Sequence, residues 1–327
     1  MNVATLLEDA RKLSGQNILV LGDLMLDQWM WGKVSRISPE APVPVVDVNR
    51  TTYTPGGAAN VVSNLLTLGS RVTVAGLIGG DDTGARLRGL LEQAGAETSG
   101  LVVSPKRRTT VKTRIIAHSQ QVVRVDQEER APFDESEAAD LRAWLEAHLD
   151  GFDGVFLSDY DKGLFTSPTL REVWPSIYGH EVPVIAGPKP ANLEVFKGVN
   201  CLTLNASEAA SATGQPMDSV ESTEQAGAKL LELSEAGAVL ITQGEKGMTF
   251  FPKAGESVSE RAFATEVFDV SGAGDTVLTV MGLGLCAGLA SSSAVKLASH
   301  AAAVVVRKLG TATVTVDEIG ESLRQRG

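Results

Sequence analysis

Hydrophobic positions follow two periods along this chain. Short runs of β-branched and apolar residues predict buried strands, and longer stretches with apolar residues three and four positions apart predict amphipathic helices. Because the two kinds of segment alternate almost throughout, we expect an α/β fold with a doubly wound, mostly parallel sheet and helices on both faces. The predicted strands are Asn17–Leu21, Arg71–Leu77, Val155–Leu157, Val184–Ala186, Cys201–Leu204 and Ala238–Ile241. The predicted helices are Ala58–Leu68, Thr83–Ala94, Glu135–Leu149, Thr166–Tyr178, Ser222–Glu235, Gly274–Ala287 and Ser291–Lys308.

Two segments break this alternation. Residues 33–52 and 107–126 are strand-like, carry polar residues at alternate positions and contain no helix between their halves. We therefore expect a small antiparallel sheet, formed by two excursions from a single domain that spans residues 1–327. A sheet in this position is a natural lid over a site that must exclude water.

Composition and charge narrow the class of protein. The most apolar stretch, Val277 to Ala290, is too short to span a bilayer, and the N-terminus is acidic where a secretory signal is basic. The two cysteines, Cys201 and Cys286, lack CxxC spacing, which predicts inert core thiols in a reducing compartment. A net charge of −11 argues against a nucleic-acid or lipid surface. We therefore expect a cytoplasmic protein that binds neither nucleic acid nor membrane.

A glycine-rich turn, Asp269-Val-Ser-Gly-Ala-Gly-Asp275, leads into one of the predicted helices. Gly272 and Gly274 allow backbone N–H groups to point into one concavity, and the helix N-terminus adds partial positive charge. This arrangement suits a transferring phosphoryl group, with Asp275 placed to accept the proton of an attacking hydroxyl. A plain glycine turn followed by a helix-stabilising aspartate is the alternative. The spacing is not that of a P-loop.

Two early segments have the chemistry to bind a polyol. Gly56 and Gly57 permit a ligand to approach the backbone closely, and Asn60 offers both donors and an acceptor. Asp27 follows the first strand, where open α/β sheets bind ligands, and could hold two sugar hydroxyls. A helix cap and a solvated loop explain the same residues without a ligand.

Two later segments suit a nucleotide. Glu208, at the start of a helix, could organise Mg²⁺ directly or through water, although Asn205 and Glu208 also have the spacing of a capping box. The loop Thr242-Gln-Gly-Glu-Lys-Gly247 follows a strand and could pass under a nucleotide, or could be a hairpin turn. The candidate nucleotide-binding residues are Asn205, Glu208, Thr242, Gly244 and Gly247.

The joint occurrence and order of these motifs resemble the ribokinase-like (PfkB) carbohydrate kinases over nearly the whole chain. The resemblance implies a β lid, ATP with Mg²⁺, in some relatives a monovalent cation near the Asp275 loop, and transfer to a sugar hydroxyl. It implies that Asp275 is the base and that the amides of Gly272, Ala273 and Gly274 form the anion hole. It makes Glu208 the metal-organising residue, places Asn205 near the phosphates, and assigns the sugar contacts to Asp27, Gly56, Gly57 and Asn60.

Four stretches are similar to one branch of this family, the heptose-phosphate kinases of ADP-heptose biosynthesis: Gly22–Asp27, Ser38–Pro44, Gln120–Asp126 and Leu157–Gly163. That branch phosphorylates the anomeric hydroxyl of D-glycero-D-manno-heptose 7-phosphate, giving the 1,7-bisphosphate used towards lipopolysaccharide core. Many members carry a fused nucleotidyltransferase domain; this chain shows no second nucleotide-transfer motif, so we expect the stand-alone kinase. This chain departs from the family pattern at three positions. It has Val270 where the family commonly has Thr, Gly187 where the branch usually has Asp, and His300 where related chains tend to carry a small amide near the adenine.

A phosphorylated sugar requires cations. The second excursion carries five of them, and two lysines follow strands; a solvated edge strand is the alternative for the lid set. We favour Arg124 and Lys189 as sugar-phosphate ligands, and we expect the exposed lid to join two copies as a homodimer. The seven cations are Arg107, Arg108, Lys112, Arg114, Arg124, Lys162 and Lys189.

Other functions stay open at this point. The same fold could serve a PfkB-type kinase for another sugar, sugar phosphate or nucleoside. A nicotinamide dehydrogenase and a non-catalytic sugar-binding regulator are alternatives of different class. The first strand leads into Gly22-Asp-Leu-Met-Leu-Asp27, without the GxGxxG of dinucleotide binding. The presence of Asp275 argues against a regulator without activity.

Overall fold

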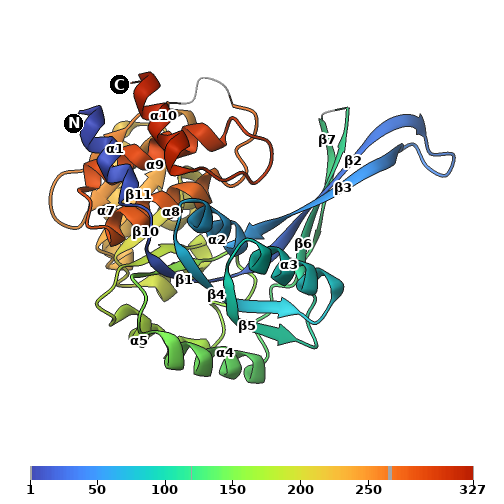
Figure 1. Ribbon diagram of the computed structural model, residues 1–327, viewed down its shortest axis with the longest axis horizontal. Helices are drawn as coiled ribbons and strands as arrows, with labels where there is room; N and C mark the ends of the chain where they lie inside the picture. Colours follow the sequence, from blue (N-terminus) through green and yellow to red (C-terminus); the bar gives the residue numbers. More distant parts are fainter. Residues whose placement is uncertain (1, 119, 264–266, 327) are drawn as a thin grey trace.

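The computed structural model describes residues 2–118, 120–263 and 267–326; residue 119, in the second expected excursion, is among those outside the described part. A nine-stranded sheet forms the centre (Figure 1). Its strands pair in parallel from β11 to β5, whereas β12 pairs antiparallel with both β11 and β13. This confirms the predicted sheet. In spatial order the strands are β13 (Val258–Glu260), β12 (Met248–Pro252), β11 (Ala238–Thr242), β10 (Cys201–Asn205), β9 (Val184–Gly187), β8 (Gly154–Ser158), β1 (Asn17–Gly22), β4 (Arg71–Gly79) and β5 (Glu97–Ser104).

Helices cover both faces of this sheet (Figure 1). Alternate residues of one strand point to opposite faces, so in β1 Ile18 and Val20 belong to one core cluster and Leu19 and Leu21 to the other. The first cluster includes α1 (Val3–Arg11), α2 (Ala58–Thr67), α3 (Asp82–Gln93), α8 (Ala273–Cys286), α9 (Ser291–Val305) and α10 (Val316–Arg326). The second includes α4 (Glu135–His148), α5 (Trp174–Tyr178), α6 (Ala206–Thr213) and α7 (Val220–Ser234).

One predicted helix, Thr166–Tyr178, is wrong over most of its length. Helical structure there is limited to the 3₁₀ turn η1 (Leu170–Glu172) and the short helix α5. Pro175 lies in the first turn of α5, where a residue without an N–H group is tolerated, whereas inside a continuous helix it would clash with the preceding turn. The helical spacing of apolar residues reflects burial of Leu170, Trp174 and Ile177. Two further 3₁₀ turns are η2 (Pro190–Phe196) and η3 (Gly244–Lys246).

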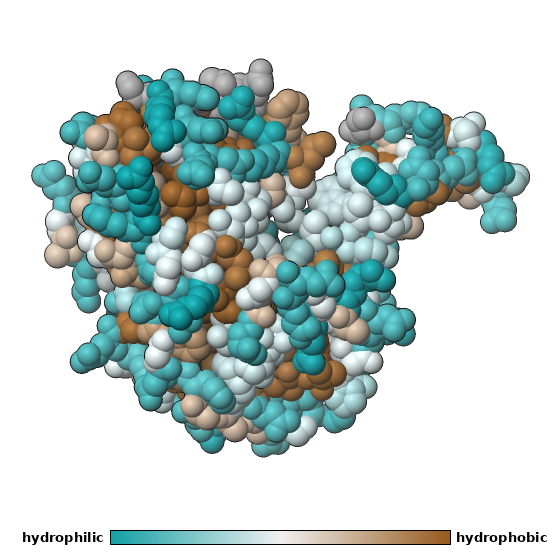
Figure 2. Space-filling model, in the orientation of Figure 1, coloured by the Kyte–Doolittle hydropathy of each residue, from teal (hydrophilic) through white to brown (hydrophobic). Residues whose placement is uncertain are grey.

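A second, four-stranded sheet projects from the body as an arm (Figures 1 and 2). We call it the lid; its spatial order is β3 (Pro44–Gly57), β2 (Leu24–Ile37), β6 (Thr110–Ala117) and β7 (Gln120–Gln127). β2–β3 and β6–β7 are antiparallel hairpins, and β2 pairs with β6 in parallel. The strands extend beyond residues 33–52, so Asp27 and Gly56 form part of the base of the lid.

Two expectations from composition concern the membrane and the thiols. Within the described ranges, the helices fall short of the length and apolar character needed to cross a bilayer. Cys201 and Cys286 are both free, and burial raises the pKa of each thiol to about 12. Thiols with such a pKa are protonated at neutral pH and react slowly.

Candidate active site

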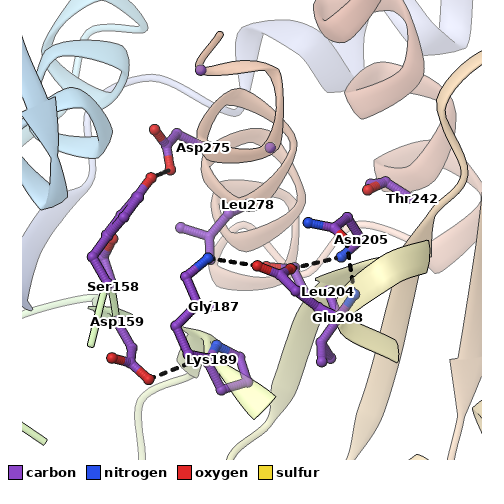
Figure 3. A pocket seen from close by; sticks show the side chains of 15 residues that line it. Ser158, Asp159, Gly187, Lys189, Leu204, Asn205, Glu208, Thr242, Asp275 and Leu278 are labelled. Carbon is purple, nitrogen blue, oxygen red and sulfur yellow. Dashed lines mark hydrogen bonds and ion pairs between the residues drawn. The ribbon is translucent and has the colours of Figure 1, made fainter. Parts of the chain in front are cut away.

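The carboxyl-terminal ends of β8, β9, β10 and β11 meet the start of α8 around one polar pocket (Figure 3). Ligands of open α/β sheets bind at this edge, because the loops that leave parallel strands gather there. The pocket brings together candidates that lie far apart in the sequence. Its polar and glycine lining includes Asp159, Tyr160, Lys189, Asn205, Glu208, Thr242, Gly272, Gly274 and Asp275.

Asp275 lies in the first turn of α8 and holds two hydrogen bonds. The side-chain amide of Asn60 donates to its Oδ2 over 2.7 Å, and the hydroxyl of Tyr160 donates to its Oδ1 over 2.7 Å. Burial raises the pKa of Asp275 to about 6, against the effect of these two donors. The carboxylate is therefore mostly ionised at neutral pH, as a proton acceptor must be.

The start of α8 approaches α2 closely at Gly272. This residue has a φ of +80°, and a Cβ atom placed on it would lie 2.8 Å from Nδ2 of Asn60. Glycine is therefore required here by backbone conformation and by space. One turn further along, the hydroxyl of Thr276 donates to Asn64 over 3.0 Å. These contacts fix Asn60 relative to Asp275.

The three backbone amides expected to form an anion hole differ in their surroundings. The N–H of Ala273 donates to the carbonyl oxygen of Val270 over 3.2 Å and must leave it to bind an anion. Gly274 is exposed, with open space where a Cβ atom would stand. The anion hole of Gly272, Ala273 and Gly274 stays a prediction.

Lys189 and Glu208 form an ion pair inside the pocket (Figure 3). Nζ of Lys189 lies 2.5 Å from Oε1 of Glu208. The other carboxylate oxygen accepts the N–H of Asn205 over 3.0 Å, and Oδ1 of Asn205 accepts the N–H of Glu208 over 2.9 Å. The capping box is thus present, and the same glutamate also faces the pocket. Lys189 belongs to the strand-end pocket, whereas Arg124 lies on the lid.

An apolar pocket adjoins the polar one, and Thr242 and Gly274 line both. The loop between β11 and β12 forms one wall, so the hairpin alternative is correct and Gly244 and Gly247 also line the pocket. His300 is buried and stacks on Phe263, a lining residue, with 4.3 Å between ring centroids. The other walls include Val267, Val270, Val277, Ala302 and Val306.

Asp27 lies at the base of the lid beside Gly56. Its side chain is 4% exposed, and Oδ1 lies 2.6 Å from a guanidinium nitrogen of Arg114, which stacks over Trp29. Burial raises the pKa of Asp27, although Arg114 acts in the opposite direction. A Cβ atom on Gly56 would lie 2.8 Å from Oδ2 of Asp27, so this approach requires glycine.

Cations gather on the lid face that carries Asp27. Strand register pairs Asp27 with Lys112, and Arg114 with Arg124, which places all four on one face. Arg124 is half exposed and pairs with Asp126 at 2.9 Å. Its role in binding a sugar phosphate stays a prediction.

Three of the other predicted cations, Arg107, Lys112 and Lys162, have structural partners. The guanidinium of Arg107 donates to the carbonyl oxygens of Glu129, Ala131 and Lys162, so it braces the loop that follows the lid. Lys162 pairs with Glu128 at 3.0 Å, and Lys112 pairs with the same carboxylate at 3.5 Å.

Residues 16–318 match the pfkB family of carbohydrate kinases. The chain belongs to this family. The match confirms the resemblance found in the sequence, and with it an ATP-dependent phosphotransferase whose acceptor is an alcohol group.

Curated relatives and solved structures agree with this assignment. The pfkB chain is 44% identical to the bifunctional protein HldE of Geobacter sulfurreducens over 307 residues, and 43% identical to that of Desulfatibacillum aliphaticivorans over 318. These alignments cover 94% and 97% of the chain but 63% and 65% of the relatives, so it spans less than two thirds of their length. An Arabidopsis thaliana ribokinase complexed with ribose and ATP has a TM-score of 0.73, and Escherichia coli phosphofructokinase-2 in complex with potassium has 0.80. Both are 18% identical and cover 95% of this chain and 99% of their own, which shows the shared fold.

The two adjoining pockets of this pfkB kinase fit ATP. The apolar pocket suits a flat purine ring, and the polar pocket with Lys189 suits the charged phosphates. The described residues hold no group of three or more His, Cys, Asp or Glu arranged for a metal. A divalent ion would therefore rely on phosphate oxygens and water, with Glu208 as a nearby carboxylate.

Three polar residues of the kinase site escaped the sequence analysis: Asp23, Asp159 and Tyr160. Oδ2 of Asp23 accepts the N–H of Tyr160 over 2.8 Å and that of Lys162 over 3.1 Å. Burial raises the pKa of Asp23 to about 6, and the nearby charge of Asp159 adds to this. Asp159 accepts the N–H of Lys189 over 2.8 Å. Asp23 directly follows β1, and Asp159 and Tyr160 are the first two residues after β8, so the strand-end argument that indicated Asp27 would also have indicated them.

Proposed function

We propose that this kinase phosphorylates the anomeric hydroxyl O1 of D-glycero-D-manno-heptose 7-phosphate, giving the 1,7-bisphosphate used towards lipopolysaccharide core. One observation carries the proposal: the lid face that holds Asp27 also holds Lys112, Arg114 and Arg124. A carboxylate suits sugar hydroxyls, and nearby guanidinium groups suit a phosphate further along the same sugar. The likeness to HldE proteins supports the same substrate class, for the kinase reaction alone.

In the proposed reaction, Asp275 accepts the proton of O1 while O1 forms a bond to the γ-phosphorus of ATP. The bond between that phosphorus and the bridging oxygen breaks, and ADP leaves with the bridging oxygen. Lys189 and the amides at the start of α8 lie beside the same pocket and would stabilise the negative charge on the transferring group.

Two ions belong to the proposal. Mg²⁺ would neutralise part of the phosphate charge, and Glu208 would hold it directly or through water. The second ion is a monovalent cation near the Asp275 loop; E. coli phosphofructokinase-2, which shares the fold, has a solved structure in complex with potassium.

We also propose that two copies of the chain pair through their lids. Val123 and Val125 alternate with Arg124 along β7, so they occupy the opposite face of the lid, and they are 44% and 52% exposed. Val48 is exposed on the same face. Hydrophobic residues gathered on one face are typical of interaction surfaces, and Figure 2 shows such residues among the hydrophilic ones of the arm. Light scattering should therefore give the mass of a dimer, and Val125→Glu should shift it towards the monomer.

A substrate panel tests the assignment. ATP consumption is measured with heptose 7-phosphate, the same heptose without phosphate, fructose 6-phosphate and ribose, and ³¹P NMR identifies the product. We expect the heptose 1,7-bisphosphate, without release of an ADP-sugar. Efficient turnover of ribose with heptose 7-phosphate inert would refute the substrate and leave the family assignment intact.

A further inference from the structure

We propose that Tyr160 is a positioning residue for phosphoryl transfer, orienting the carboxylate of Asp275 through its hydroxyl while its ring supports Lys189. The inference rests on the proposed role of Asp275 as the base. Tyr160 is the second residue after β8, and its side chain contacts both Asp275 and Lys189.

The hydroxyl of Tyr160 and the amide of Asn60 hold opposite oxygens of one carboxylate. Each donor lies 2.7 Å from its acceptor, Oδ1 and Oδ2 of Asp275 respectively. Two donors on two oxygens fix the rotation of the carboxylate plane. Since each oxygen has two lone pairs, one lone pair on each is left to accept a proton. Burial and the charge of Asp275 raise the pKa of Tyr160 well above its usual value, so its hydroxyl stays a donor.

The backbone of Tyr160 is anchored by buried carboxylates on both sides. Asp23, 3% exposed at the end of β1, accepts the N–H groups of Tyr160 and Lys162. Asp159, 2% exposed, accepts the N–H of Lys189 over 2.8 Å and that of Asp161 over 2.8 Å. The segment that carries Tyr160 is therefore tied to β1 on one side and to the end of β9 on the other.

The ring of Tyr160 also contacts the cation of the pocket. Nζ of Lys189 lies 5.1 Å from the ring centroid and 2.5 Å from Glu208. At this distance the ring attracts the ammonium group. One side chain thus sets the position of the proposed base and contributes to that of the lysine that lines the same pocket.

Tyr160→Phe removes the hydroxyl and keeps the ring, so it tests the contribution of the hydroxyl alone. Without the hydroxyl, Asp275 loses a donor that favours its ionised form, so its pKa rises and its carboxylate can rotate. A hydrogen bond to a charged group is typically worth a factor of ten or more. We expect the single-turnover rate with ATP and heptose 7-phosphate to fall about tenfold, with KM for both substrates within about threefold. The acid limb of the rate–pH profile should move upward by about one unit.

Tyr178→Phe is the matched control. The hydroxyl of Tyr178 donates to the carbonyl oxygen of Val195 over 2.7 Å, in the core cluster on the α4–α7 side of the sheet. This variant loses a hydrogen bond of similar length, and its rate and acid limb should equal those of the wild type. If Tyr160→Phe does not fold, 3-fluorotyrosine incorporated at position 160 keeps the ring and strengthens the donor, so the acid limb should move downward.

The outcomes separate this inference from the reaction on which it rests. If Asp275→Asn is inactive while Tyr160→Phe keeps the wild-type rate and acid limb, the positioning role is wrong and the base stands. If Tyr160→Phe is slower but the acid limb of its rate–pH profile does not move, Tyr160 has only a structural role, and the inference is again wrong. If Asp275→Asn itself is active, the proposed base is wrong.

Discussion

Asp275→Asn replaces the proposed base with a side chain of nearly the same shape that does not accept a proton at neutral pH. General-base catalysis is typically worth about 10²–10⁴-fold. An anomeric hydroxyl is more acidic than an ordinary alcohol, so the lower part of this range applies. We expect kcat to fall at least about a hundredfold, with nearly normal affinity for ATP and sugar.

The same substitution should raise stability. Burial raises the pKa of Asp275 from 3.8 to about 6, so folding at neutral pH places an ionised group where its neutral form is favoured. Below about pH 4 the carboxyl group is neutral in both the folded and the unfolded state. As the pH rises from about 4 to 6, the group ionises more readily in the unfolded state, so the free energy of unfolding falls. A shift of roughly two units corresponds to about 3 kcal/mol, which partial exposure to the pocket reduces to about 1–2 kcal/mol. Asn removes this cost.

The assay combines single-turnover kinetics, ligand titrations and urea unfolding at pH 7.5. Wild-type kcat should fall on acidification through pH 6, and the free energy of unfolding of the variant should exceed that of the wild type. Asp81→Asn is the control, because hydrogen bonds from Gly84 and Thr109 outweigh burial and lower the pKa of Asp81. It should lose stability and keep its activity. If the rate of the Asp275→Asn enzyme is within a few-fold of the wild-type rate, Asp275 does not accept the proton of the sugar hydroxyl and the proposed mechanism is wrong.

Four further predictions concern the rest of the site. Glu208→Gln keeps the capping box but not the charge, so kcat should fall and the Mg²⁺ optimum rise while stability changes by less than about 1 kcal/mol. Arg114→Ala leaves a buried carboxylate unpaired and should cost about 3 kcal/mol of unfolding free energy in urea. Arg124→Ala removes an exposed ion pair and should lower the free energy of unfolding by less than about 1 kcal/mol. It should raise KM for the sugar phosphate more than KM for ATP. Equal effects on the two KM values would show that Arg124 is not part of the sugar-phosphate site. Gly272→Ala meets a positive φ and a close neighbour and should destabilise by more than about 1 kcal/mol, whereas Gly274→Ala meets open space and should unfold like the wild type.

The sequence predicted those elements whose local pattern matches their environment. β1, β8 and β10 are apolar runs buried on both faces, so composition alone indicated them. β5 mixes buried and exposed positions without alternation, and β13 has three residues, so neither has a clear strand pattern. Both edges of the main sheet were therefore missed: the parallel strand β5 at one edge, and the antiparallel strands β12 and β13 at the other.

Candidate site residues could be predicted from the sequence where they follow a predicted strand or a glycine-rich turn. Asn60, Asp275 and Glu208 were candidates because each lies in the first turn of a helix. Partnerships between distant segments were not predictable: Lys189 pairs with Glu208, and Arg107 braces a loop rather than a ligand. Tertiary contacts determine which charged side chains pair within the protein and which are left to bind a substrate. The sequence shows only that these charged side chains are present.

The long strand β2 runs from the base of the lid to its tip, with register shifts against β3 between Trp31 and Gly32 and between Val34 and Arg36 (Figure 1). Asp27 lies near its start, and Ile37 lies ten residues further along. At about 3.3 Å per residue this distance is roughly 33 Å. A rotation of about 10° at Asp27 would therefore displace the tip by about 6 Å while hardly moving the carboxylate. If the lid rotates about Asp27, the predicted sugar contact, a spectroscopic label near Ile37 would report a small adjustment at that residue as a large displacement.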